Sequence, residues 1–175
     1  FSAPPPASPV APPAVELEPQ VLGRARELGE LVGLLTQAST RLVTVLGPGG
    51  IGKSTLAGLV TARLRGVFSD GVFEIPLAAL TQADQIFPAI ADATGLKPIS
   101  EKPLPPQLFG HLGGKRILLI LDNVEQLTEN AQHFKAILDG APSVRILTTS
   151  RERLNLQDEV VFRLDGLRVP ADGHD

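Results

Sequence analysis

Hydrophobic residues recur along this 175-residue chain in two patterns that alternate with each other. Short, continuously apolar runs rich in Val, Ile and Leu begin near residues 41, 71, 116, 143 and 159. Such runs are typical of strands buried on both faces of a parallel sheet. Between them, apolar residues lie three and four positions apart, as in amphipathic helices. The alternation predicts parallel βαβ units and an α/β fold, a three-layer sandwich with a five-stranded sheet.

The boundaries of these elements follow from the pattern and from glycine and proline positions. Strands are predicted at residues 41–47, 71–77, 116–123, 143–151 and 159–166. Helices are predicted at residues 23–35, 53–66, 81–96, 107–114 and 125–140. Pro88 lies inside the third helical pattern, so we expect a kink or a late start there.

Both ends of the chain differ from the periodic part. Residues 1–20 contain seven prolines and no periodic apolar pattern, and we interpret them as a semi-rigid linker. A ligand for a proline-binding module is the alternative, but no basic residue flanks a P-x-x-P there. We expect one nucleotide-binding domain at residues 21–166, and the start of a linker into a missing C-terminal module at residues 167–175. The chain lacks an initiating Met, so we expect a fragment of a longer protein.

A glycine-rich segment between the first strand and the second helix carries the clearest chemistry. Residues 47–54 read GPGGIGKS. This segment matches the dinucleotide pattern G-x-G-x-x-G and also the P-loop pattern G-x-x-x-x-G-K-S. Both patterns place backbone N–H groups and a helix N-terminus against a phosphate.

Two further acidic residues separate the two interpretations. A dinucleotide site needs an acid at the end of the second strand, but Glu74 falls inside that strand. A P-loop needs Lys and Ser or Thr after its last glycine, which Lys53 and Ser54 supply, and an acid ending another apolar strand, which Asp122 supplies. We therefore predict a P-loop that binds ATP or ADP, with Lys53 on the phosphates and with Ser54 and Asp122 on Mg²⁺. The residues predicted to contact the nucleotide from this segment are Gly47, Gly49, Gly50, Ile51, Gly52, Lys53, Ser54 and Thr55.

Composition excludes several other classes of protein. The chain has no cysteine, which removes disulfides and thiol chemistry. Its formal net charge of −3 gives no overall basic field for nucleic acid. No apolar run approaches the roughly 18 residues that a membrane span needs, and the first residues lack the pattern of a signal peptide. We expect a cytoplasmic domain without direct nucleic-acid or membrane contacts.

Four stretches in this order resemble the STAND signal-transduction ATPases, and among them the NB-ARC type and bacterial LuxR-like regulators. They are LGRARELGELVGLL, LGPGGIGKSTLA, LLILDNVEQL and RILTTSRERL. The resemblance covers residues 21–165 and implies a sheet in the order 5-1-4-3-2. It also implies a signalling switch that binds ATP or ADP, and helical and winged-helix modules that follow the domain and close over the nucleotide. Nucleotide-dependent self-association of the full-length protein stays open.

The resemblance also assigns roles to residues outside the P-loop. Leu22 and Arg24 match the N-terminal motif that flanks the adenine. Arg151 matches the arginine that faces the γ-phosphate, and it follows the strand that would lie between the P-loop strand and the Asp122 strand. Surface positions at helix starts are the alternative for both arginines.

The residue after Asp122 departs from many active relatives, which carry a second acid there as general base. Here it is Asn123, which can orient a water molecule but cannot take its proton. Glu125 is a substitute base, unless it serves only the dipole of a helix start. We expect slow hydrolysis, with Lys53, Asp122, Asn123 and Arg151 as the catalytic set. A binding module without meaningful hydrolysis and an AAA-type motor are the rival functions.

Overall fold

The computed structural model describes residues 24–50 and 52–164. Within these residues one parallel sheet contains β1 (Leu42–Leu46), β2 (Val72–Pro76), β3 (Leu118–Asp122), β4 (Arg145–Ser150) and β5 (Glu159–Arg163). The strands are arranged in the order β2-β3-β4-β1-β5, which confirms the predicted 5-1-4-3-2. β4 therefore lies between β1 and β3, so the ends of these three strands meet at one edge.

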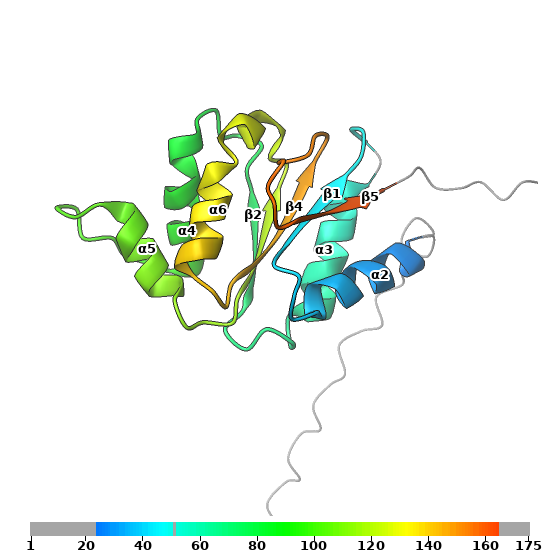
Figure 1. The fold of residues 1–175 in the computed structure, drawn as a ribbon, viewed down its shortest axis with the longest axis horizontal. Coiled ribbons are helices and arrows are strands. Elements are labelled where there is room, and N and C mark those ends of the chain that lie inside the picture. Colours follow the sequence, from blue (N-terminus) through cyan, green and yellow to red (C-terminus); the bar gives the residue numbers. More distant parts are fainter. Residues whose placement is uncertain (1–23, 51, 165–175) are drawn as a thin grey trace, which may run out of the picture.

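Helices cover both faces of the sheet (Figure 1). They are α2 (Ala25–Thr36), α3 (Lys53–Leu64), α4 (Ile86–Thr94), α5 (Leu104–Leu112) and α6 (Gln132–Gly140), with the 3-10 segments η1 (Ala83–Gln85) and η2 (Glu125–Asn130). The helices α4, α5 and α6 contribute to one buried cluster, and α2 and α3 contribute to the other. This arrangement confirms the predicted three-layer sandwich.

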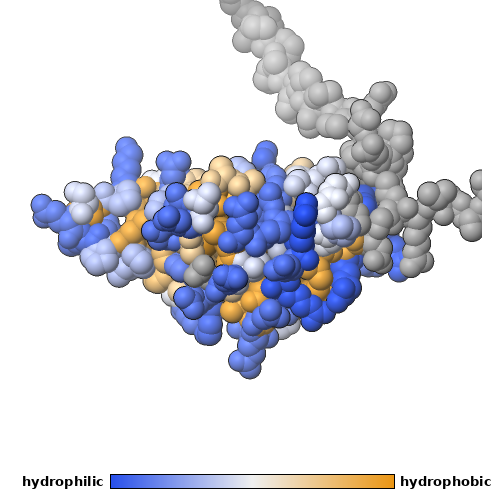
Figure 2. Space-filling view, turned by 90° about the horizontal axis from the view of Figure 1, so that it is seen from above, coloured by the Kyte–Doolittle hydropathy of each residue, from blue (hydrophilic) through white to orange (hydrophobic). Residues whose placement is uncertain are grey.

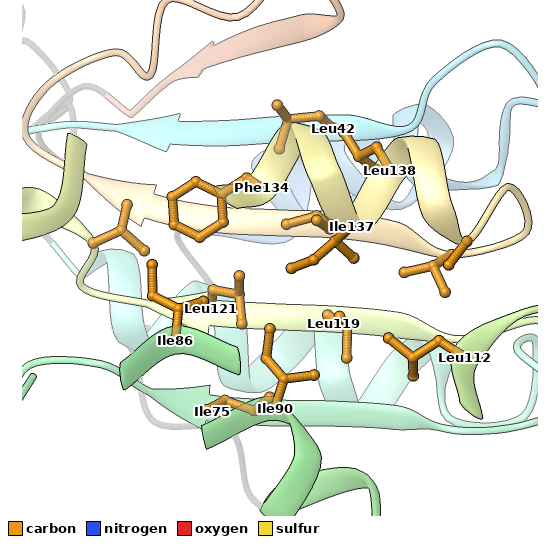
Figure 3. Close-up of a cluster of buried hydrophobic side chains, with 14 of the residues drawn as sticks. Leu42, Ile75, Ile86, Ile90, Leu112, Leu119, Leu121, Phe134, Ile137 and Leu138 are labelled. Atoms are coloured by element: carbon orange, nitrogen blue, oxygen red, sulfur yellow. The ribbon is translucent and has the colours of Figure 1, made fainter. Parts of the chain in front are cut away.

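Alternate residues of each central strand enter the two clusters. In β3, Leu119 and Leu121 pack with α4, α5 and α6, while Leu118 and Ile120 pack with α2 and α3. Figure 3 shows the first cluster, in which side chains of α4 and α6 converge on the strands. All four β3 leucine and isoleucine side chains are fully buried. Burial on both sides is the reason why these four positions are all apolar.

Two predicted helices begin at clearly different residues in the structure. The pattern at residues 81–96 becomes an α-helix only at Ile86, so Pro88 lies in its first turn, where a missing N–H costs no helical hydrogen bond. The helix predicted at 107–114 begins earlier, at Leu104, again with prolines in its first turn.

The single helix predicted at residues 125–140 is wrong, because the segment is divided into η2 and α6. The buried residues Val124 and Leu127 are three positions apart. That spacing suits a 3-10 turn with three residues per turn as well as it suits an α-helix. Apolar spacing alone therefore could not separate the two.

The outer surface is mostly polar. The face in Figure 2 is dominated by hydrophilic residues, with hydrophobic residues in small areas between them. Among the described residues, the large exposed hydrophobic side chains are Val67 and Ile99. No helix in that part of the chain is long and apolar enough to cross a membrane. The first 23 residues and residues 165–175, with the two predicted linkers, lie outside the described residues.

The packing between α5 and α6 predicts an asymmetric response to two glycine substitutions. A Cβ on Gly140 would lie 2.6 Å from Cγ and 2.8 Å from Cδ2 of Phe109. Gly140→Ala should therefore destabilise the domain by about 1–3 kcal/mol through overpacking. Gly58, inside α3, has nothing within 4 Å of such a Cβ. Gly58→Ala should be neutral or stabilise by up to about 1 kcal/mol. Urea denaturation of both variants measures this, and equal effects would contradict the packing argument.

Candidate nucleotide-binding site

The P-loop, residues 47–54, joins the end of β1 to the start of α3. The Gly47 N–H donates to the Ser150 carbonyl (3.1 Å), which ties the loop to β4. Gly50 and Gly52 have φ angles of +78° and +97°, in the left-handed region that favours glycine. α3 begins directly after Gly52 and has no acidic residue in its first turn. Its N-terminal N–H groups therefore form an anion-binding end.

Lys53 is folded back over this loop. Its side chain is only 8% exposed, and Nζ donates to the carbonyls of Gly47 (2.7 Å) and Pro48 (2.9 Å). Burial lowers the pKa of the Lys53 ammonium from its usual value. Among the nearby charges the largest effect on this pKa comes from Glu125, which raises it, followed by Arg151, which lowers it. Charges of both signs therefore act on the Lys53 ammonium.

Three side-chain oxygens meet where β3 and β4 end. Ser54 Oγ donates to Asp122 Oδ1 (3.1 Å), and Thr149 Oγ1 donates to the same carboxylate oxygen. Hydroxyl and carboxylate oxygens are the ligands that Mg²⁺ prefers. The residues present therefore fit a magnesium ion held by Ser54 and Asp122, with Thr149 orienting the carboxylate.

The Arg151 guanidinium lies against Gly49 of the P-loop. Arg151 follows β4 directly, and no helix begins there. A Cβ built on Gly49 would overlap the Arg151 guanidinium, so the guanidinium covers the loop at this point. Only glycine leaves room for this contact without moving the arginine.

Asn123 turns the chain away from β3. Its φ of +68° is in the left-handed region, where Asn is enriched among non-glycine residues. Its N–H donates to Thr149 Oγ1 (2.8 Å). Its side-chain amide lies next to the Glu125 carboxylate.

These groups surround one cavity of about 450 Å³. It is lined by Gly49, Gly50, Gly52, Lys53, Ser54, Thr55, Asn123, Glu125, Thr149 and Arg151. Gly47 and Asp122 lie next to this cavity, because Gly47 accepts a hydrogen bond from Lys53 and Asp122 accepts one from Ser54. The structure thus brings together most of the residues that the sequence predicted.

The remaining predicted residues lie apart or outside the described chain. Arg24 is 5% exposed, and its Nη1 donates to Glu27 Oε1 (3.3 Å). Its Nη2 would be 4.0 Å from a Cβ on Gly52, so the guanidinium lies beside the P-loop. Leu22 and Ile51 lie outside the described residues.

Thr149 was missed by the sequence analysis, although a signal was present. It is one of three consecutive hydroxyl-bearing residues that end β4, two positions before Arg151. By contrast, Glu74 of the dinucleotide interpretation is in the middle of β2 at the far edge of the sheet, where it accepts a hydrogen bond from Thr61 (3.2 Å). It cannot reach the P-loop from there.

Comparison with known proteins agrees with this arrangement. A family model described as an AAA domain matches residues 36–157. The match covers more than half of the chain, so the chain belongs to this family of P-loop domains.

Two relatives extend the comparison to longer proteins. The chain is 34% identical over 152 residues to the uncharacterized protein Rv0894 of Mycobacterium tuberculosis, covering 86% of this chain and 38% of that protein. It is 32% identical over 133 residues to the putative HTH-type transcriptional regulator Rv0890c of the same organism, covering 75% of this chain and 15% of that protein. The chain therefore spans well under half the length of either relative.

Solved structures share the fold at low identity. CDC6P of Pyrobaculum aerophilum has a TM-score of 0.61 at 17% identity, over 90% of this chain and 48% of that one. A STAND protein with a tetratricopeptide repeat sensor, PH0952 of Pyrococcus horikoshii, has a TM-score of 0.55 at 16% identity, over 92% of this chain and 26% of that one. The predicted resemblance to STAND-type ATPases is confirmed at the level of the domain.

The shared oxygen cluster predicts a metal-specific defect. Asp122→Ala should weaken ADP binding in Mg²⁺ by roughly tenfold or more, because the carboxylate acts through the ion. Binding without Mg²⁺ should change by less than about threefold, because the loop amides hold phosphate without it. Titrations of ADP with and without Mg²⁺ measure both, and Asp92→Ala on the exposed side of α4 is the control. Equal losses in the two titrations would rule out the metal role.

Proposed function

We propose that this chain is the nucleotide-binding domain of a STAND-type ATPase switch, which binds ATP or ADP with Mg²⁺ and hydrolyses ATP slowly to reset. The supporting observation is the approach of Arg151 to Gly49 of the P-loop. It places the cation that follows β4 on the same cavity as Lys53 and Ser54. Arg151 can therefore contact a phosphate group that the P-loop binds.

Each group has a defined task in this proposal. The loop amides and the start of α3 hold the phosphates, and the Lys53 ammonium exchanges its carbonyl partners for phosphate oxygens. Ser54 and Asp122 hold Mg²⁺, which neutralises phosphate charge when bound. Arg151 contacts the γ-phosphate, which only ATP carries. Arg24 lies beside Gly52 and supports the loop next to the nucleotide.

The switch requires parts that lie beyond this domain. The relatives are much longer than this chain, and one of them is named as a putative HTH-type transcriptional regulator. We propose that C-terminal helical and winged-helix modules close over the cavity and that ATP and ADP favour different arrangements of them. Nucleic-acid contacts, input sensing and any self-association would belong to the full-length protein, in the cytoplasm.

Nucleotide should stabilise the folded chain through the P-loop. At about 100 times its dissociation constant, Mg-ADP should add roughly 2.7 kcal/mol, a rise in Tm of roughly 5–10 °C. Lys53→Ala should remove most of this rise, because a charge-assisted hydrogen bond contributes about 1.5–3 kcal/mol. Thermal melts with and without Mg-ADP measure it.

Two controls test whether the effect is specific to Lys53 and to ADP. Lys97→Ala removes an exposed lysine away from the cavity and should keep the full rise in Tm. NAD should produce no rise in the wild-type chain. Stabilisation by NAD but not by ADP would overturn the proposed function.

ATP turnover by this chain alone should be very slow. The proposed closing modules are not part of this chain, so water is not excluded from the cavity. The rate per molecule should not depend on protein concentration. Phosphate release measured over a hundredfold concentration range tests this. A rate per molecule that climbs steeply would instead favour the motor function, with an arginine supplied by a neighbouring copy.

A further inference from the structure

Three arginines lie together at the edge of the sheet opposite the P-loop. Arg41 directly precedes β1, Arg145 is the first residue of β4, and Arg116 lies two residues before β3. These three strands are adjacent and parallel, so their amino ends share one edge, and the proposed nucleotide site lies at the other. Strands of this length separate the two edges by roughly 15–20 Å.

The three arginines line one cavity of about 200 Å³. Its other lining residues are Ala38, Pro142 and Ser143, so no acidic side chain among the described residues lines it. The Ser143 hydroxyl makes no hydrogen bond to any described residue. The volume is that of roughly six water molecules, which is enough room for a phosphate group.

Two of the arginines also stabilise helix ends. The Arg41 guanidinium donates three hydrogen bonds of 2.8–2.9 Å to carbonyls after the last turn of α6 and within it, which are those of Leu138, Ala141 and Val144. Arg145 Nη1 donates to the Leu35 carbonyl in the last turn of α2. Cations are favourable at helix C-termini. These contacts therefore explain why positions 41 and 145 carry arginine.

Arg116 has no such partner among the described residues. Its backbone N–H donates to Asp70 Oδ2 (2.7 Å), but its exposed guanidinium forms no hydrogen bond or ion pair there. Its Cζ lies 5.9 Å from the centroid of the buried Phe68 ring, and Cζ of Arg145 lies at the same distance from that ring. Two positive groups thus approach one aromatic ring, and stabilisation of a helix end does not explain the second of them.

Like charges are therefore crowded at this edge of the sheet. Burial lowers the pKa of the Arg145 guanidinium from its usual value, and the positive charges of Arg116 and Arg41 lower it further. A bound anion would offset this repulsion. Guanidinium groups present paired N–H donors that match the oxygens of a phosphate, so phosphate is the anion that suits this cavity.

We propose that this cavity binds a phosphate group, held by the guanidinium groups of Arg116 and Arg145 and by the Ser143 hydroxyl, while Arg41 keeps its carbonyl partners. The phosphate is a free ion or the terminal group of a larger molecule. It joins the starts of β3 and β4 to the loop between α6 and β4. This second site is separate from the P-loop and does not depend on the proposed function.

Site-resolved NMR titration of the chain with inorganic phosphate tests this, with chloride at equal ionic strength as the reference. The Nε–H signals of Arg116 and Arg145 and the backbone N–H signal of Ser143 should shift along one saturating curve. Arg116→Gln should weaken this binding by roughly tenfold or more, because a hydrogen bond between charged groups is lost. Lys115→Gln is the matched control. It removes the same charge from a neighbour that does not line the cavity, and it should keep the affinity.

Two further titrations separate this site from the P-loop and identify the source of the phosphate. In Lys53→Ala the shifts of Ser143 with phosphate should remain, because Lys53 lies at the other edge of the sheet. AMP carries the same group on a nucleoside. Equal shifts with AMP indicate that the site accepts the phosphate of a larger molecule, and shifts with phosphate alone indicate a free ion. Both results support the site.

Three outcomes would overturn it. They are a response to phosphate no larger than that to chloride, equal losses in Arg116→Gln and Lys115→Gln, and loss of the Ser143 shifts in Lys53→Ala. Because Arg116 is exposed, Arg116→Gln should keep its Tm without phosphate within about 2 °C of the wild-type value, so its loss of binding is not a loss of fold. None of these outcomes changes the stabilisation expected from Mg-ADP at the P-loop.

Discussion

The hydrogen bonding of β4 to β1 on one side and to β3 on the other is the constraint on which this structure depends. Parallel pairing fixes the register of β4 against both neighbours. Because parallel strands end at the same edge, the P-loop after β1, Asp122 of β3 and Arg151 after β4 are brought to one cavity. The two hydrophobic clusters support this by holding helices on both faces of the sheet (Figure 1).

Thr149 connects the central strand β4 to the residues of the proposed magnesium site. Its hydroxyl donates to Asp122 and accepts from the Asn123 N–H, and its carbonyl accepts from the Val124 N–H. One residue of the central strand therefore orients the proposed magnesium ligand and turns the chain that carries Glu125. The polar groups of this network lie in a largely buried region. Their hydrogen bonds to one another offset the free-energy cost of removing them from water.

The wrong prediction of one continuous helix at residues 125–140 also affected the interpretation of Glu125. A continuous helix from residue 125 would explain Glu125 as a favourable charge at a helix start. In the structure a 3-10 segment begins there, and Glu125 lines the cavity beside the P-loop. Local spacing predicted the buried residues Val124 and Leu127 but not the helix type.

The sequence by itself determined the α/β class, the strand positions, the P-loop between β1 and α3, and the acid at the end of β3. These follow from local rules: apolar runs predict buried strands, and GPGGIGKS requires positive φ angles and an adjacent helix N-terminus. The strand order 5-1-4-3-2 also came from the sequence, through family resemblance. Only the tertiary structure decided that Arg151 covers Gly49, that Thr149 bonds to Asp122, and that Glu125 lines the cavity. The first two of these features are contacts between separate strands and loops, and the third depends on a left-handed backbone angle at Asn123 that apolar spacing does not encode.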